Sequence, residues 1–213
     1  MTPILALRPT QMAVGMQQVG VKEAKVSAKV LHQPNKKKAD KWLRSRPVPV
    51  VLGPGGPSSQ QPQRYLIDHH HLTFALFRQG ITHCYCQQVV SDQSALGWEQ
   101  FWEYMEGQHY VWPYSSDGTP LSLQEFVAHL PSDVRGLKDD PYRSLAALVR
   151  GEGGYEKVSV WVPFSEFRWA NWLRSAVPLK EGEDPAQTHV VQAAVRLAGT
   201  PQAQHLPGFK AAS

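Results

Sequence analysis

The sequence predicts an α+β protein in which a small mixed sheet with its helices is followed by an all-helical C-terminal extension. Three observations lead to this fold class. Within residues 1–92, short apolar runs alternate with turn residues, as they do around strands and short helices. From residue 93 onward, apolar residues recur at helical spacing between prolines and glycines. A length of 213 residues is sufficient for one or two domains with a buried core.

The first 64 residues or so supply most of the expected sheet. We expect, in order, a strand at 4–9, a helix at 17–33, a basic connector with one helical turn at 35–46, a strand at 48–53, a loop rich in Gly, Pro and Ser at 54–63, and a strand at 64–67. The two strands on either side of the loop are expected to pair as a hairpin.

The stretch "DHHHLTFALFRQG" predicts a helix of about three turns, with Asp68 as its N-cap and Gly80 just beyond its end. A strand at 82–90 follows. The later helices are expected within 96–107, 121–130, 140–151, 164–175 and 184–199. We therefore expect a first domain at 1–92, a helical domain rich in aromatic residues at 93–200, and a disordered tail at 201–213.

The net charge of +4 is unevenly distributed along the chain. Residues 22–46 hold nine Lys and Arg against Glu23 and Asp40, so this segment carries +7 and the rest of the chain about −3. Such a segment indicates an anionic partner, such as nucleotide phosphates, nucleic acid or a phosphorylated substrate. A solvated helix face with a charged loop explains the same pattern, and the sequence leaves both open.

Three consecutive histidines stand where the strand at 64–67 turns into a helix. A helix start attracts anions through its unpaired N–H groups and the helix dipole. Asp68 either caps the helix or binds a metal. His69, His70 and His71 lie about 100° apart in the first turn, which argues against a metal site made of all three. One or two of them either contact phosphate and move a proton, or are partly buried and bonded to backbone.

The run from "LALRPTQMAVGMQQVGVKEAKV" to "RYLIDHHHLTFAL" resembles the ParB/sulfiredoxin superfamily. The motifs "LRPTQMAVG" and "DHHH" are most similar to its ParB-like putative nuclease group, as are "DDPYRSLA" and "FSEFRWANWLR" further on. Residues 4–90 match the wider superfamily, and the similarity to the group spans most of the chain. The resemblance implies a ParB/sulfiredoxin-like first domain that binds nucleotide phosphates at the helix start.

The superfamily motif has Gly after the acid and Arg after the His, whereas this chain has His69 and His71 there. Loss of Gly restricts the approach of backbone to phosphate, and loss of Arg removes a bidentate clamp. The resemblance implies that Asp68 interacts with Mg²⁺ or a hydroxyl group. It also implies phosphate contacts, which we assign to the helix start with His69, His70, His71 and Arg8. Asp68, His70 and Lys22 are then the candidate catalytic residues.

Three further residues are possible supporting members of the site: Glu23, Arg143 and Ser144. Each has an ordinary alternative. Glu23 is either a general base or, as we favour, an ion-pair partner. Arg143 either completes the site or pairs with Asp139 or another acid of the C-terminal part. Lys22 and Arg8 have the corresponding alternatives of a solvated lysine and a surface ion pair.

Two other groups of residues have simpler explanations. Cys84 and Cys86 share one face of a strand, but no second pair of ligands completes a zinc site, so two small core residues are favoured. No cysteine lies beside the phosphate-binding motif, which argues against sulfiredoxin activity. The aromatic residues at helical spacing are attributed to packing rather than to stacking on a base: Trp98, Phe101, Trp102, Trp169 and Trp172.

The favoured function is a nucleotide-dependent enzyme or switch that binds ATP, ADP or CTP with Mg²⁺ and transfers or hydrolyses phosphate. The alternative is a DNA-binding protein or nuclease that uses the basic segment 22–46, and a second alternative is a catalytically inactive adaptor. No helix-turn-helix pattern with a basic recognition helix follows residue 92, so a chromosome-partition protein is not expected. No apolar run suits a membrane helix and no signal peptide is evident, so we expect a cytoplasmic protein without a membrane partner.

Overall fold

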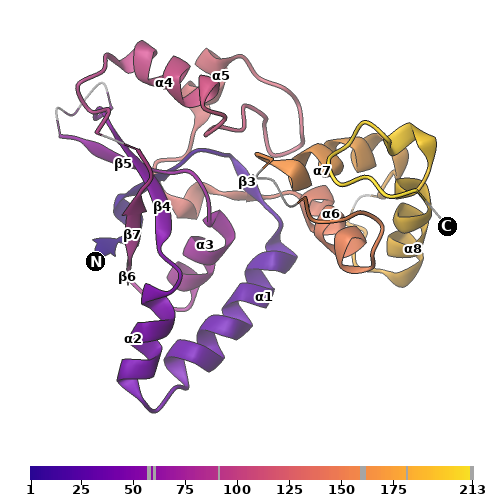
Figure 1. Ribbon diagram of the computed structural model, residues 1–213, viewed down its shortest axis with the longest axis horizontal. Coiled ribbons are helices and arrows are strands. Elements are labelled where there is room, and N and C mark those ends of the chain that lie inside the picture. Colours follow the sequence, from indigo (N-terminus) through magenta and orange to yellow (C-terminus); the bar gives the residue numbers. More distant parts are fainter. Residues whose placement is uncertain (57–58, 60, 91, 159–161, 181, 212–213) are drawn as a thin grey trace. The chain divides into compact units, whose positions relative to one another are not determined.

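The computed structural model describes residues 1–56, 59, 61–90, 92–158, 162–180 and 182–211. The protein is mixed α+β, as the sequence predicts (Figure 1). It divides into two compact units, Met1–Lys138 and Asp139–Ser213. This division differs from the expected boundary at residue 92, because the two helices after that residue pack on the sheet of the first unit.

A four-stranded sheet forms the centre of the first unit, in the order β2-β5-β4-β7. Strand β2 (Leu7–Pro9) runs parallel to β5 (Gln63–Leu66), and β4 (Val48–Gly53) runs antiparallel to β5 and parallel to β7 (Cys86–Gln88). The expected hairpin is therefore confirmed. Two shorter strands, β1 (Thr2–Pro3) and β6 (His83–Cys84), pair antiparallel, and Tyr85 interrupts the strand expected at 82–90.

One face of the sheet is covered by helices α1 (Met16–Val26) and α3 (His70–Arg78) (Figure 1). The alternation of side chains along β4 and β5 explains this, because Val50 and Leu66 point into the core shared with these helices. A 3-10 turn (Ile4–Ala6) replaces the first half of the strand expected at 4–9. Strand β3 (Ala13–Val14) leads into α1, which continues as a π-helical segment (Ser27–Leu31).

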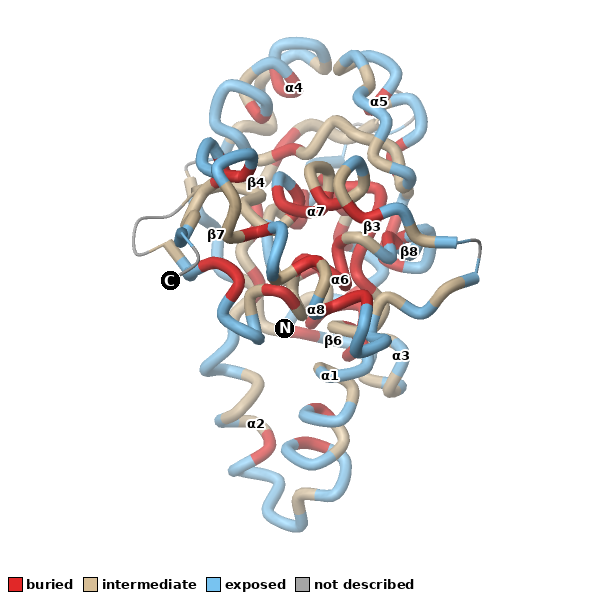
Figure 2. Tube along the Cα trace, turned by 90° about the vertical axis from the view of Figure 1, so that its right-hand side faces the viewer, coloured by how far each residue is buried: buried red, intermediate tan, exposed pale blue. Residues whose placement is uncertain are grey.

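Helix α2 (Lys36–Arg44) is longer than the single turn that the sequence predicts. Asn35 caps its start by accepting the N–H of Lys38 at 3.2 Å, and Trp42 and Leu43 pack against the core. These two contacts stabilise a helix whose remaining residues are mostly charged. Figure 2 shows that α2 is largely exposed, whereas buried residues gather along the sheet.

The other face of the sheet is covered by α4 (Trp98–Gly107) and α5 (Leu123–His129). Val51 and Tyr65 point to this side and pack with Phe101 and Trp102. Gly53 permits the close approach, since a Cβ there would lie 2.3 Å from the ring of Phe101. A 3-10 turn (Val134–Gly136) and β8 (Lys138–Asp139) end the unit, where the N–H of Lys138 donates to the carbonyl of Met12 at 3.0 Å.

The second unit is helical, as expected, and consists of α6 (Pro141–Gly151), α7 (Ser165–Ala176), α8 (Thr188–Ala198) and a 3-10 turn (Pro201–Ala203). Asp140 caps α6 by accepting the N–H groups of Tyr142 and Arg143. The described part of the expected disordered tail packs instead: Ala203 and Leu206 are buried, and the indole of Trp169 donates to the carbonyl of Pro207 at 2.8 Å. Within the described residues, no helix is long and apolar enough to cross a membrane.

Candidate functional site

The junction between β5 and α3 carries the histidine run, and its backbone has an uncommon conformation. His69 is left-handed, with φ 64° and ψ 22°. Glycine adopts this conformation at the least cost, and histidine adopts it more readily than most residues do. The motif of the resembling superfamily has glycine at this place. His69 therefore keeps the turn that a glycine would make.

Asp68 does not cap α3, contrary to the prediction. The N-cap is His69, whose side chain makes no capping hydrogen bond, and the helix begins at His70. The exposed carboxylate of Asp68 instead accepts the N–H of His69 at 2.6 Å. The left-handed residue between Asp68 and the helix separates the carboxylate from the first turn. The start of α3 is thus left without a capping side chain.

His70 is a buried histidine bonded to backbone on both sides. It is 2% exposed, its Nε2 accepts the N–H of Thr10 at 3.2 Å, and its ring also bonds to the carbonyl of Leu66. Burial lowers its pKa to about 4, although the nearby charge of Asp68 opposes this. The side chain is therefore neutral at pH 7. The ring is buried and its Nε2 is engaged by Thr10, so the geometry supports a positioning role rather than direct contact with phosphate.

His71 makes the matching bond one residue later. Its Nε2 accepts the N–H of Gly15 at 3.0 Å, and Gly15 is the N-cap of α1. Together, His70 and His71 hold the two ends of the segment 10–15 against the start of α3. This segment is buried and belongs to the "LRPTQMAVG" motif. Two of the three histidines therefore connect the two motifs of the resemblance to each other.

A lysine and an arginine lie close to the junction. The pKa of Lys22 is lowered first by its partial burial and then by the charges of Lys25 and Arg46, while Asp68 raises it. The charges of Lys22 and Asp68 therefore interact, and Arg46, which the sequence does not single out, also acts on Lys22. His69 is half-buried beside them, and its Nδ1 has no hydrogen-bond partner among the described residues.

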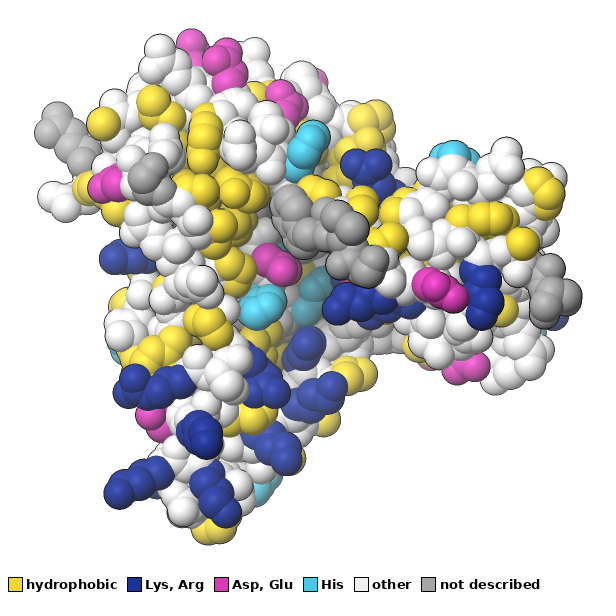
Figure 3. Space-filling model, in the orientation of Figure 1, with side chains coloured by type: hydrophobic (Ala, Val, Ile, Leu, Met, Phe, Trp, Pro, Cys, Tyr) yellow, Lys and Arg dark blue, Asp and Glu magenta, His cyan; other side chains and the backbone are white. Residues whose placement is uncertain are grey.

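The Lys and Arg side chains of the basic segment gather over α1 and α2 on a surface that we call the basic face (Figure 3). It contains Lys22, Lys25, Lys29, Lys36, Lys37, Lys38, Lys41, Arg44 and Arg46. Most of these side chains are exposed, whereas Lys22 is half-buried. The two acids of the segment are already paired: Asp40 with Arg44 at 2.6 Å, and Glu23 with Arg78 of α3 at 2.6 Å. The preferred interpretation of Glu23 as an ion-pair partner is therefore confirmed, with a partner outside its own helix.

Arg8 lies on the other side of the sheet from α3. Its guanidinium stands over the ring of Trp98, 5.6 Å from the centroid, and its charge acts on the hydroxyl of Tyr65. Burial raises the pKa of Tyr65 to about 12, and the charge of Arg8 opposes that rise. Leu7 points into the core under α3, so the next residue along β2 must point away from it. The structure does not bring Arg8 to the histidine run.

Arg143 and Ser144 belong to the second unit. Both are buried in α6, where Arg143 pairs with Glu166 and stands over the ring of Phe167 at 5.3 Å. The alternative of an ion pair with an acid of the C-terminal part is therefore realised. Ser144 is 1% exposed. Within their unit, these side chains serve the packing of α6 against α7.

Metal ligands are sparse in the described part of the chain, which has no group of three His, Cys, Asp or Glu suited to hold a metal ion. Cys84 and Cys86 are unbridged, with their sulfurs 4.0 Å apart. Cys84 is buried in the core, as expected of a small core residue. Among the junction residues 68–71, the carboxylate belongs to Asp68.

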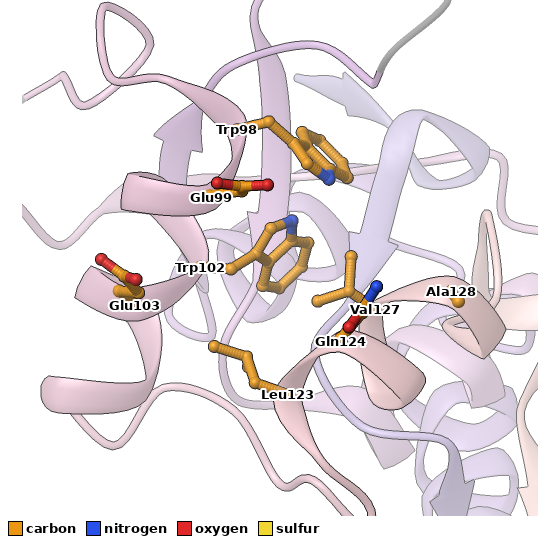
Figure 4. Close-up of a pocket in the computed structure, with 8 residues that line it drawn as sticks. All are labelled: Trp98, Glu99, Trp102, Glu103, Leu123, Gln124, Val127 and Ala128. Carbon is orange, nitrogen blue, oxygen red and sulfur yellow. The ribbon is translucent and has the colours of Figure 1, made fainter.

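A separate groove of 490 Å³ lies between α4 and α5 (Figure 4). Trp98, Trp102, Leu123 and Val127 form its apolar lining, and Glu99 and Glu103 stand along α4. The expected packing role is confirmed for Trp102, which is 2% exposed, and likewise for Phe101 and Trp169, which are fully buried. The groove is acidic and apolar, which makes it a poor match for phosphate.

Comparison with known proteins agrees with the motifs. A family model described as "Putative ParB-like nuclease" matches residues 1–175. The crystal structure of protein Atu1540 from Agrobacterium tumefaciens is similar to this chain with a TM-score of 0.81 and 33% sequence identity. The similarity covers 100% of this chain and 97% of that chain. A search of curated proteins finds no match.

Proposed function

The chain belongs to this ParB-like family, and from that premise we propose that it binds the phosphate backbone of nucleic acid along the basic face. One observation carries the proposal: the Lys and Arg side chains of 22–46 gather over α1 and α2 (Figure 3), and Lys22 among them interacts with the charge of Asp68. A row of exposed cations neutralises successive phosphates and releases their counterions, which favours binding of any sequence.

The junction at the end of the basic face provides the groups for cleavage of a phosphodiester. Hydrolysis needs a group that takes a proton from the attacking water and a cation that stabilises the charge that develops. We assign the first task to His69 or Asp68 and the second to Lys22. His70 and His71 position the junction by holding the segment 10–15. Mg²⁺ commonly binds through one or two carboxylates together with phosphate oxygens, so Asp68 fits as its single protein ligand.

The test is binding of a labelled oligonucleotide over a range of salt concentrations. If about half of the nine cations contact phosphates, the logarithm of the binding constant falls with the logarithm of salt with a slope of about −3 to −4. Charge reversal of Lys36, Lys37 and Lys38 to Glu should reduce the slope by about 2 and weaken binding at low salt at least tenfold. Three exposed lysines of the second unit provide the control, reversed in the same way: Lys157, Lys180 and Lys210. Equal loss in both triple variants, or no binding at low salt, would contradict the proposal.

A mononucleotide is the second candidate ligand, favoured by the uncapped start of α3 beside half-buried Lys22. It is tested by thermal shift with ATP, ADP, CTP and GTP, each with Mg²⁺. A ligand that binds only the folded protein raises the melting temperature. Lys22→Met keeps the length of the side chain but removes its charge, so it should abolish the shift. If no nucleotide raises the melting temperature at millimolar concentration, this candidate is rejected. A protein that binds neither ligand would fit the adaptor alternative.

A further inference from the structure

Two arginine–aromatic pairs stand at the end of α2 on the basic face. The guanidinium of Arg46 lies over the ring of Trp42, 4.4 Å from its centroid. The guanidinium of Arg44 lies over the ring of Tyr85, 4.6 Å from its centroid. Backbone binding requires only positive charge, and lysines supply that elsewhere on this face. The two pairs therefore suggest a second kind of contact.

Asp40 holds both members of the Arg44–Tyr85 pair. Its carboxylate accepts a bond from Nε of Arg44 at 2.6 Å and from the hydroxyl of Tyr85 at 2.6 Å. The bond from Tyr85 lowers the pKa of Asp40, and the same bond raises the pKa of Tyr85. The side chain of Arg44 is nevertheless 63% exposed. It is fixed from beneath by the ring and from the side by Asp40, so that much of its surface remains open to solvent.

The Arg46–Trp42 pair is fixed in a similar way. Arg46 donates to the carbonyl of Trp42 at 3.3 Å and to the hydroxyl of Ser45 at 2.8 Å. Trp42 is half-buried against the core, while Arg46 itself is exposed. The charges of Arg46 and Asp68 both act on Lys22, which connects this pair electrostatically with the groups assigned to cleavage.

A guanidinium plane backed by an aromatic ring is a flat cationic platform on which a nucleobase can stack. Bases within a duplex are stacked on one another and do not offer their faces, whereas the bases of a single strand do. We propose that the chain prefers single-stranded nucleic acid, with bases stacked on the Arg44–Tyr85 and Arg46–Trp42 pairs and phosphates on the neighbouring lysines. This inference rests on the proposed binding of the phosphate backbone.

The experiment compares three labelled ligands of equal length, about a dozen nucleotides: oligothymidylate, the same strand with abasic residues, and a duplex. The abasic strand has the phosphates without the bases, so it separates backbone binding from stacking. We expect the thymidylate strand to bind about tenfold more tightly than the abasic strand. An oligouridylate of the same length shows whether the preference extends to RNA.

The decisive variant carries Arg44→Lys and Arg46→Lys, which keeps both charges and removes both planes. It should lose the tenfold preference for thymidylate, so that its affinity for thymidylate falls about tenfold more than its affinity for the abasic strand. Tyr85 provides a second test, because it lies outside the described hydrophobic clusters. Tyr85→Leu should reduce the preference, whereas Tyr85→Phe, which keeps the ring, should retain most of it.

The outcomes separate the two proposals. Equal affinity for the thymidylate and abasic strands, or a preference for the duplex, would overturn the stacking site and leave backbone binding intact. Retention of the full preference by the double lysine variant would also overturn it. If wild type binds none of the three ligands at low salt, the proposed function fails and this inference fails with it.

Discussion

Replacement of His70 by glutamine tests whether this buried histidine is neutral and structural. Burial lowers its folded pKa to about 4 from an ordinary 6.5, with Asp68 opposing the shift and His69 adding to it. Between these pH values the unfolded chain binds a proton that the folded chain does not. The free energy of unfolding is therefore highest above pH 6.5 and decreases as the pH falls toward 4. The full effect is about 3 kcal/mol, of which about 2 kcal/mol is lost between about pH 7.5 and about pH 5.

The assay is urea unfolding of wild type and His70→Gln at these two pH values. Glutamine does not titrate, and its amide offers both an acceptor for the N–H of Thr10 and a donor for the carbonyl of Leu66. The other eight histidines are common to both proteins, so their titration cancels in the comparison. Wild type should lose about 2 kcal/mol more than the variant on acidification. An equal loss in both proteins would refute the idea that His70 is kept neutral by the fold.

The same variant tests the role of His70 in binding. Because the ring is buried and its Nε2 accepts the N–H of Thr10, His70→Gln should bind an oligonucleotide at pH 7.5 with the affinity of the wild type. A variant that is folded but binds at least tenfold more weakly would restore His70 as a phosphate contact, as the superfamily resemblance implies. The unfolding curves supply the control for folding.

Two further predictions concern stability and are checked by thermal or urea unfolding. His69→Val should lower the free energy of unfolding by about 2 kcal/mol, since a β-branched residue is strained at positive φ. His69→Gly should change it by less than about 1 kcal/mol. Similar effects of the two substitutions would mean that residue 69 is not left-handed. Gly53→Ala should cost about 1–3 kcal/mol, because the added Cβ meets Phe101 at 2.3 Å and Tyr65 at 2.9 Å. Gly20→Ala should instead raise the free energy of unfolding, because nothing lies within 4 Å of the added Cβ. If Gly53→Ala left the free energy of unfolding unchanged, the close packing of α4 on the sheet would be contradicted.

The elements with strong local patterns could be predicted from the sequence. The hairpin of β4 and β5 follows from two apolar runs on either side of a Gly- and Pro-rich loop. The sequence predicts a shorter α2 than the structure has, because most of its residues are charged. The helix is stabilised by Trp42 and Leu43, which pack on a core built from residues distant in the sequence. The domain boundary depends on packing too: nothing local in α4 indicates that Phe101 fills the space left by Gly53.

The candidate site could be predicted only in part. The junction and its neighbour Lys22 are recognisable from the motifs and the charge pattern. The partners of His70 and His71 lie 60 and 56 residues away, so no periodicity could reveal them. Arg8 was expected at the histidine run but lies at Trp98, on the other side of the sheet. Its strand, Leu7–Pro9, is too short for an alternating pattern to show which face the side chain points to. By contrast, Trp42 and Arg46 are four residues apart at the end of a helix, and that spacing was an available signal for the pair.

The departures from the superfamily motif bear directly on whether the site is active. The adaptor alternative rests on the loss of Gly and Arg, but the left-handed turn that Gly would make is present at His69. Positive charge that interacts with Asp68 is also present, from Lys22. What is lost is the bidentate clamp, since Lys22 binds as a point charge and Arg46 is already stacked on Trp42. A site of this kind should hold a phosphate by charge with little demand on its orientation, which suits a phosphodiester backbone better than the fixed phosphates of a mononucleotide.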